Sequence, residues 1–234
     1  MGAQVTHAIS ALSRNFLPSE INATRFIVAT VGVLFALAGI DHGFFETLQG
    51  YTPTPGFIIH AIGEHNRMWV YGTEDALTLI PNFVVSGIVA IGISLLIAVW
   101  SVGFVQKKHG STIFLLLFIF LFLSGGGLAQ IVYFTLAWAV STRINKPLTW
   151  LRRSLPARVR VALGMPWLWL LGGFTLPSLM ALEIAIFGYV PGVSDPKQAL
   201  HICWSLLAVG SVFLLLAIAS GFIHDADREL GAMR

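Results

Sequence analysis

The sequence predicts an all-α fold, a polytopic transmembrane helical bundle. Only 11% of its 234 residues are charged, whereas a soluble domain usually carries about 25%. The chain is 56% hydrophobic, and its mean hydropathy is +0.80. So few charges cannot cover a surface that faces water. The composition therefore favours the lipid bilayer as the main partner and a multi-pass protein of the cell membrane, and it argues against binding to nucleic acid.

Five near-continuous apolar segments are each long enough to cross about 30 Å of hydrocarbon, which takes roughly 20 residues as a helix. None contains Lys or Arg between its flanks. Backbone polar groups must be paired inside lipid, so these segments are expected to be helices. We expect residues 1–234 to form a single integral membrane domain with spans at approximately 26–45, 82–105, 113–140, 165–190 and 200–222.

Small residues mark one face of each of the first two spans. They recur every three or four residues at Ala29, Gly32, Ala36, Gly39 and Gly43, and again at Gly87, Ala90, Ser94, Ala98 and Ser101. Such stripes let neighbouring helices approach closely. The third segment is interrupted by Gly125–Gly127, and the fourth contains Pro166 and Pro177. We therefore expect both of these helices to be kinked or tilted.

Two connections are long and opposite in charge. Residues 46–81 form an acidic loop, and residues 141–162 form a basic loop with six Lys or Arg and no acid. Interleaved Leu and Trp side chains in the basic loop predict an interfacial segment that lies on anionic headgroups; an ordinary solvated loop is the alternative. Residues 54–71 could also enter the membrane as a re-entrant or sixth element. We rank that second, because ionisable side chains make a crossing that faces lipid costly.

The distribution of Lys and Arg predicts the orientation. Five spans place the termini on opposite faces of the membrane. Lys and Arg then number five on the face of the N-terminus and nine on the other. The N-terminus is therefore expected outside the cell and the C-terminus in the cytoplasm. The first 16 residues have no long apolar core, so we do not expect them to be a cleaved signal peptide.

The stretch GIDHGFFETLQGYTPTPGFIIHAIGEHNRMW, residues 39–69, is the strongest indication of a functional site. His42 precedes Glu46 by four residues, and His60 precedes Glu64 by four. Four-residue spacing on a helix places both side chains on one face, from which they can reach a single ion. Mixed His and carboxylate sites commonly hold zinc or iron. The metal-ligand candidates are therefore His42, Glu46, His60 and Glu64, and structural ion pairs at the membrane surface are the competing interpretation.

Four further residues are candidates for binding a ligand. Arg67 and Glu74 lie in the same acidic loop, and Arg67 could hold an anionic group. Glu183 lies inside the fourth apolar segment, where an unpaired acid costs several kcal/mol. Gln130, one helical turn before Tyr133, could line the same interior.

These observations leave several functions open. The leading hypothesis is a His/Glu polar site at one membrane face that binds a divalent metal or a polar ligand; if it is catalytic, Glu46 or Glu64 would be a ligand or general base. A small proton-coupled transporter that titrates Glu183 is the alternative. A third is a non-catalytic subunit, as a homo-oligomer or with a membrane partner, or one that holds haem through His42, His60, His65 or His201.

The single cysteine, Cys203, excludes an intrachain disulfide.

Overall fold

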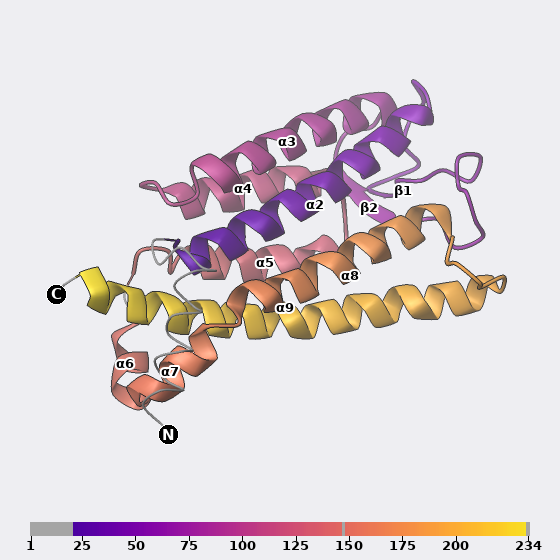
Figure 1. The fold of residues 1–234 in the computed structure, drawn as a ribbon. Coiled ribbons are helices and arrows are strands. Elements are labelled where there is room, and N and C mark those ends of the chain that lie inside the picture. The colour runs from indigo at the N-terminus through magenta and orange to yellow at the C-terminus, as the bar shows by residue number, and fades with distance from the viewer. Residues whose placement is uncertain (1–20, 147, 233–234) are drawn as a thin grey trace.

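The computed structural model describes residues 21–146 and 148–232, so the expectation about the first 16 residues lies outside this part of the chain. Helices dominate it. They are α2 (Ala23–Leu48), α3 (Phe83–Gly103), α4 (Gly110–Leu123), α5 (Gln130–Ser141), α6 (Thr149–Ser154), α7 (Ala157–Gly164), α8 (Trp167–Phe187) and α9 (Pro196–Ala232). Three short strands, β1 (Ile58–His60), β2 (Asp75–Thr78) and β3 (Ser124–Gly127), form a small sheet at one end of the bundle (Figure 1).

Four segments are long and apolar enough to cross a membrane: Ala23–Leu48, Phe83–Gly103, Ala157–Phe187 and Pro196–Asp227. They coincide with four of the five predicted spans, which supports a membrane-embedded helical protein. The third predicted span, 113–140, differs. The structure divides it into α4 and α5, which at 1.5 Å per residue are about 21 Å and about 18 Å long. Neither reaches across about 30 Å of hydrocarbon.

The chain reverses direction between α4 and α5. Phe114 and Phe118 of α4 contact Phe134 of α5, so the two helices fold back on each other. The reversal occurs at the sequence SGGG of β3, where Gly125 has a φ of +106° that side chains rarely tolerate. The expected kinked helix is therefore a hairpin of the two helices α4 and α5 (Figure 1), and the strand β3 lies between them in the chain.

The strand at the hairpin tip completes a sheet with the acidic loop. The strand order is β1-β2-β3 and both pairings are antiparallel. Ala76 pairs with Gly127 and Thr78 with Ser124, so the polar backbone of SGGG is hydrogen-bonded within the protein. Residues 54–71 contain β1 and turns and no helix. They do not form a sixth crossing; the element that turns back is 110–141.

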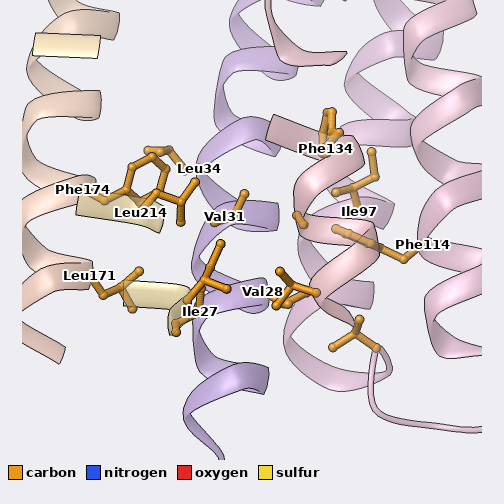
Figure 2. Close-up of a cluster of buried hydrophobic side chains, with 14 of the residues drawn as sticks. Ile27, Val28, Val31, Leu34, Ile97, Phe114, Phe134, Leu171, Phe174 and Leu214 are labelled. Atoms are coloured by element: carbon orange, nitrogen blue, oxygen red, sulfur yellow. The ribbon is translucent and has the colours of Figure 1, made fainter. Parts of the chain in front are cut away.

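The core is built around α2 (Figure 2). Val31 and Leu34 of α2 lie between side chains of α8 and α9 on one side and of α3, α4 and α5 on the other. The two small-residue stripes meet each other and bring α2 against α3, a pairing that the sequence analysis did not specify. A Cβ atom added at Gly32, Gly39 or Gly43 would collide with Ser101, Ser94 or the backbone of Gly87. The close approach of α2 and α3 therefore depends on these glycines.

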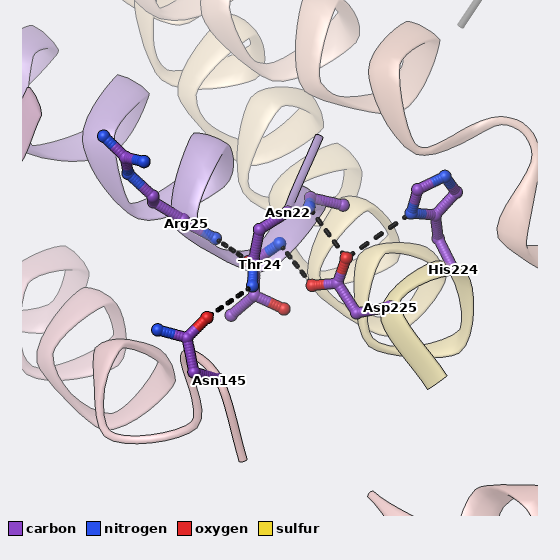
Figure 3. Close-up of polar contacts among 7 residues, drawn as sticks. Asn22, Thr24, Arg25, Asn145, His224 and Asp225 are labelled. Atoms are coloured by element: carbon purple, nitrogen blue, oxygen red, sulfur yellow. Dashed lines mark hydrogen bonds and ion pairs between the residues drawn. The ribbon is translucent and has the colours of Figure 1, made fainter. Parts of the chain in front are cut away.

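Both ends of the described chain lie at one end of the bundle (Figure 3). The Asp225 carboxylate in α9 accepts hydrogen bonds of 2.8 Å from the backbone N–H groups of Ala23 and Thr24, the first residues of α2. The end of α3 is there too, because Arg25 donates to the carbonyl of Val102 at 3.0 Å. Five spans would have placed the two ends on opposite faces. The four long helices and the hairpin instead return the chain to its starting side.

This end, which we call the basic end, includes the α3–α4 turn and the connection from α5 to α8. Ten of the twelve Lys and Arg in residues 21–232 belong to it, and the other two, Arg67 and Lys197, belong to the opposite end. The predicted basic loop is largely helical, as α6 and α7. It is attached to α9 through Leu151, which packs on Ile223, and through Arg160, whose Nε lies 2.6 Å from Asp227 Oδ1.

Candidate functional site

Two ionisable side chains are buried in the last two turns of α2, at the end of the bundle opposite the basic end. His42 is 5% exposed and Glu46 is fully buried. The hairpin tip covers both. A Cβ added at Gly125 would collide with the Glu46 carboxylate, and one added at Gly127 would lie 2.6 Å from His42 Cε1. From the sequence, we interpreted SGGG only as a break in a helix. In the structure it also provides the space for these two side chains.

His42 forms an ion pair with Glu74. Its Nε2 contacts Glu74 Oε2, and Glu74 immediately precedes β2, so the sheet brings the acid to the helix. Burial would raise the pKa of Glu74, but the adjacent His42 outweighs this effect and holds the pKa below its ordinary value of 4.5. The sequence suggested that Glu74 belongs to the site, but its pairing with His42 depends on the loop conformation.

The pair leaves three buried polar atoms without hydrogen-bond partners in the part of the chain that the structure describes. They are Nδ1 of His42 and both carboxylate oxygens of Glu46, one helical turn away. A buried polar group normally has a partner, because leaving it unpaired costs about 1–3 kcal/mol. These three atoms are therefore suited to hold or transfer a proton.

A cavity of about 460 Å³ adjoins the ion pair. It lies between α2, α5, α8 and α9, beneath the loop that leads to β2, and its volume is typical of small-molecule sites. The polar residues that line it include Tyr71, Thr73, Glu74, Asp75, Gln130, Tyr133 and Ser178. Glu74 therefore joins two features, since it contacts His42 and also lines the cavity.

Gln130 adds a buried acceptor to the cavity wall. The side chain is only 6% exposed, and its Oε1 has no hydrogen-bond partner among the described residues. Tyr133, one turn further along α5, also lines the cavity, and its hydroxyl is 2.7 Å from Ser211 Oγ. Gln130 and Tyr133 thus line one cavity, but Glu183, which was expected to share their interior, is not among its lining residues.

The cavity roof is fixed to α8 through Trp69. The indole Nε1 donates a hydrogen bond of 2.9 Å to the carbonyl of Ala185. Gly188, with a φ of +64°, ends α8 so close to the indole that a Cβ there would collide with it. Trp69 was not identified from the sequence. An aromatic residue within a loop of mixed charge was the available signal, but its partner is 116 residues away.

The other predicted site residues do not join this arrangement. His60 Nδ1 lies 2.9 Å from Asp75 Oδ1, and both side chains are more than half exposed. Glu64 and Arg67 are exposed on the loop, which is not helical there, so the second H-x3-E pair does not share a helix face. The described residues contain no group of three or more His, Cys, Asp and Glu side chains that could hold a metal ion.

Glu183 also lies elsewhere. It was expected inside the bundle, but it is exposed on the outer surface of α8, and His201, a haem-ligand candidate, is likewise exposed on α9. Position along the chain had placed Glu183 at membrane depth, yet a span with no strong polar face does not reveal which side is inward. His65, a haem-ligand candidate, is exposed as well.

A larger hollow of about 830 Å³ runs along α2 near the basic end. Arg25 and Asn22 line its polar mouth, and most of its wall is apolar. Among the described residues, its lining includes Gln106, whose buried Oε1 has no hydrogen-bond partner, but it includes no carboxylate. The smaller cavity therefore carries more of the chemistry, because it is also lined by Glu74, the partner of His42.

In comparisons with known proteins, no protein family matches the chain, and neither a curated protein nor a solved structure is significantly similar to it.

Proposed function

We propose that this multi-pass membrane protein binds a small ligand in the cavity beneath the acidic loop, with Glu74 and Gln130 as its polar contacts. The observation that carries the proposal is the unpartnered Gln130 Oε1, buried in the wall of a cavity of about 460 Å³ that Glu74 also lines. Ligand sites typically combine an apolar wall with a few convergent polar groups. A ligand that donates to Gln130 would satisfy an acceptor that the protein leaves open.

Three probes with the same ring test the proposal: benzylamine, benzyl alcohol and benzoate. Thermal unfolding of the purified full-length protein should shift upward with at least one of them, because a ligand that binds only the folded state stabilises it. Gln130→Leu should reduce that shift, whereas the exposed Glu64→Gln should not. Absence of a shift with all three probes would rule out the proposed site.

A proton-coupled carrier is the second candidate function. It is supported by the series Glu46, His42 and Glu74, which leads from a fully buried carboxyl to a residue that lines the cavity. In this carrier hypothesis the group that titrates is the His42–Glu74 pair, whereas the hypothesis from the sequence used Glu183. Uptake of labelled benzylamine into proteoliposomes should then depend on an imposed pH gradient. Uptake that does not depend on the pH gradient would contradict the hypothesis of a proton-coupled carrier.

We also infer that the basic end faces the cytoplasm, which places both ends of the described chain on that side. Ten of twelve cationic residues belong to this end, a larger bias than five spans would give. Cysteine labelling of intact cells tests the orientation: Gly56→Cys should react with an impermeant reagent, and Ser154→Cys should not. The reverse labelling would overturn it.

A further inference from the structure

The charges around the cavity indicate which ligands it favours. Its lining includes two acids, Glu74 and Asp75, and no Lys or Arg. An anionic ligand would therefore lack a cationic partner and would face like charge. The lining also includes five aromatic residues: Phe35, Trp69, Tyr71, Tyr133 and Trp204. Aromatic faces attract cations, most strongly where water is excluded.

The unpartnered acceptor points the same way. Gln130 Oε1 is a buried acceptor beside the cavity, so a ligand that reaches it would do so with a hydrogen-bond donor. An ammonium group offers up to three N–H donors and a positive charge, which match the amide oxygen of Gln130 and the carboxylate of Glu74 together. A neutral alcohol could satisfy Gln130 but would gain less from Glu74, because hydrogen bonds between two charged groups are the stronger ones.

We propose, on the basis of the function proposed above, that the ligand is a small protonated amine with an apolar body, and that its binding releases a proton from His42. Glu74 is the link, because it contacts His42 Nε2 and lines the cavity. When an ammonium takes over the Glu74 carboxylate, the buried imidazolium loses its counter-ion beside a second positive charge. The imidazolium N–H bond then breaks, its electron pair stays on the ring, and the proton goes to water.

The surroundings of the pair decide where this proton goes. On α2, His42 faces Asp41 and Glu46, and the loop contributes Glu74. Cys203 of α9, Tyr133 of α5 and Tyr71 of the loop lie on the cavity side. Glu46 is fully buried without a hydrogen-bond partner among the described residues, an environment in which a charged carboxylate is costly. In this proposal Glu46 keeps its own proton, so the proton that His42 releases goes to water. One positive charge enters the site and one leaves.

Calorimetry of the full-length protein in detergent tests whether binding of the ammonium releases a proton from His42. Benzylamine should bind more tightly than benzyl alcohol, and benzoate should not bind. Titrations in buffers with different ionisation heats should show release of up to about one proton per benzylamine bound. The apparent affinity should accordingly rise up to about tenfold per pH unit while His42 is protonated.

Variants separate this inference from the proposed function. Glu74→Gln should weaken benzylamine binding at least tenfold, and His42→Gln should abolish the proton release; Glu64→Gln is the matched exposed control. If either variant misfolds, the pH dependence of the wild-type affinity gives the same answer. Tighter binding of benzoate or benzyl alcohol, or benzylamine binding without proton release, would overturn this inference and leave the site intact. If none of the three probes binds, both proposals fail.

Discussion

Glu46 and His42 are buried because two glycines make room for them. At Gly125 and Gly127 the hairpin tip approaches α2 so closely that any side chain would meet the carboxylate or the imidazole. The sequence revealed the two ionisable residues and the glycines separately. It did not reveal that they meet, because about 80 residues separate them and the contact depends on the strand pairing of β3.

Gly125→Ala should destabilise the protein by about 2 kcal/mol or more, because it combines a strained positive φ with a collision at Glu46. Gly92→Ala is the matched control, since nothing lies near that position of α3 and alanine favours helix by up to about 1 kcal/mol. Unfolding midpoints in one detergent compare the two. Equal midpoints for both variants would mean that the hairpin tip does not pack on Glu46.

Glu74 should make the stability depend on pH. Its pKa is lower in the folded protein than the ordinary value of 4.5, so the folded state favours the charged carboxylate. This contribution is complete above about pH 4.5 and is lost as the pH falls through the lowered folded-state pKa. Thermal unfolding of the wild type and of Glu74→Gln, followed from neutral pH downward, should therefore converge in acid. A constant difference at every pH would contradict the ion pair.

The hairpin of α4 and α5 shows what hydropathy alone cannot resolve. Residues 113–140 are apolar throughout except near the glycines, so a long tilted helix and two short antiparallel helices have nearly the same composition. The choice depends on whether the backbone of SGGG finds hydrogen-bond partners. β2 supplies them, and a loop expected to be irregular or helical gave no sign of that pairing.

Single-cysteine labelling distinguishes the two arrangements. Lys108→Cys lies before the hairpin and Ser154→Cys lies after it, each in a Cys203→Ser background. The structure predicts that both react from the same side of inverted membrane vesicles, because 110–141 returns to its starting side (Figure 1). Five crossings would place them on opposite sides, so labelling of only one in a given vesicle orientation would refute the hairpin.

In the molecule as a whole, the two ends of the described chain contact each other. The carboxylate of Asp225 in α9 accepts hydrogen bonds from the first two N–H groups of α2, a role that a side chain at the helix start usually plays. Asn22, which immediately precedes α2, contacts Asn145 beyond α5. The membrane class could be predicted from composition, and the presence of helix faces suited to close packing could be predicted from small-residue spacing. The contact between the two ends could not be predicted, because it joins residues about 200 positions apart.

Asp225→Ala should lower the free energy of unfolding by about 1–2 kcal/mol, as expected for loss of a helix N-cap. Asp225→Asn should lose less, since its amide oxygen can still accept one hydrogen bond. Glu64→Ala on the exposed loop serves as the control and should be close to neutral. Denaturant midpoints in mixed micelles measure all three, and a neutral Asp225→Ala would show that the ends are held by packing alone.

The position of β3 in the sheet also has a consequence for biosynthesis. Chains emerge from the ribosome N-terminus first, so β1 and β2 are made well before SGGG. The hairpin tip therefore reaches a template that already exists, and its polar backbone need not remain unpaired in lipid. A ribosome-stalled chain from whose exit tunnel residue 141 has already emerged should accordingly protect the 49–82 loop from protease, whereas one from which residue 124 has not yet emerged should leave the loop open to cleavage.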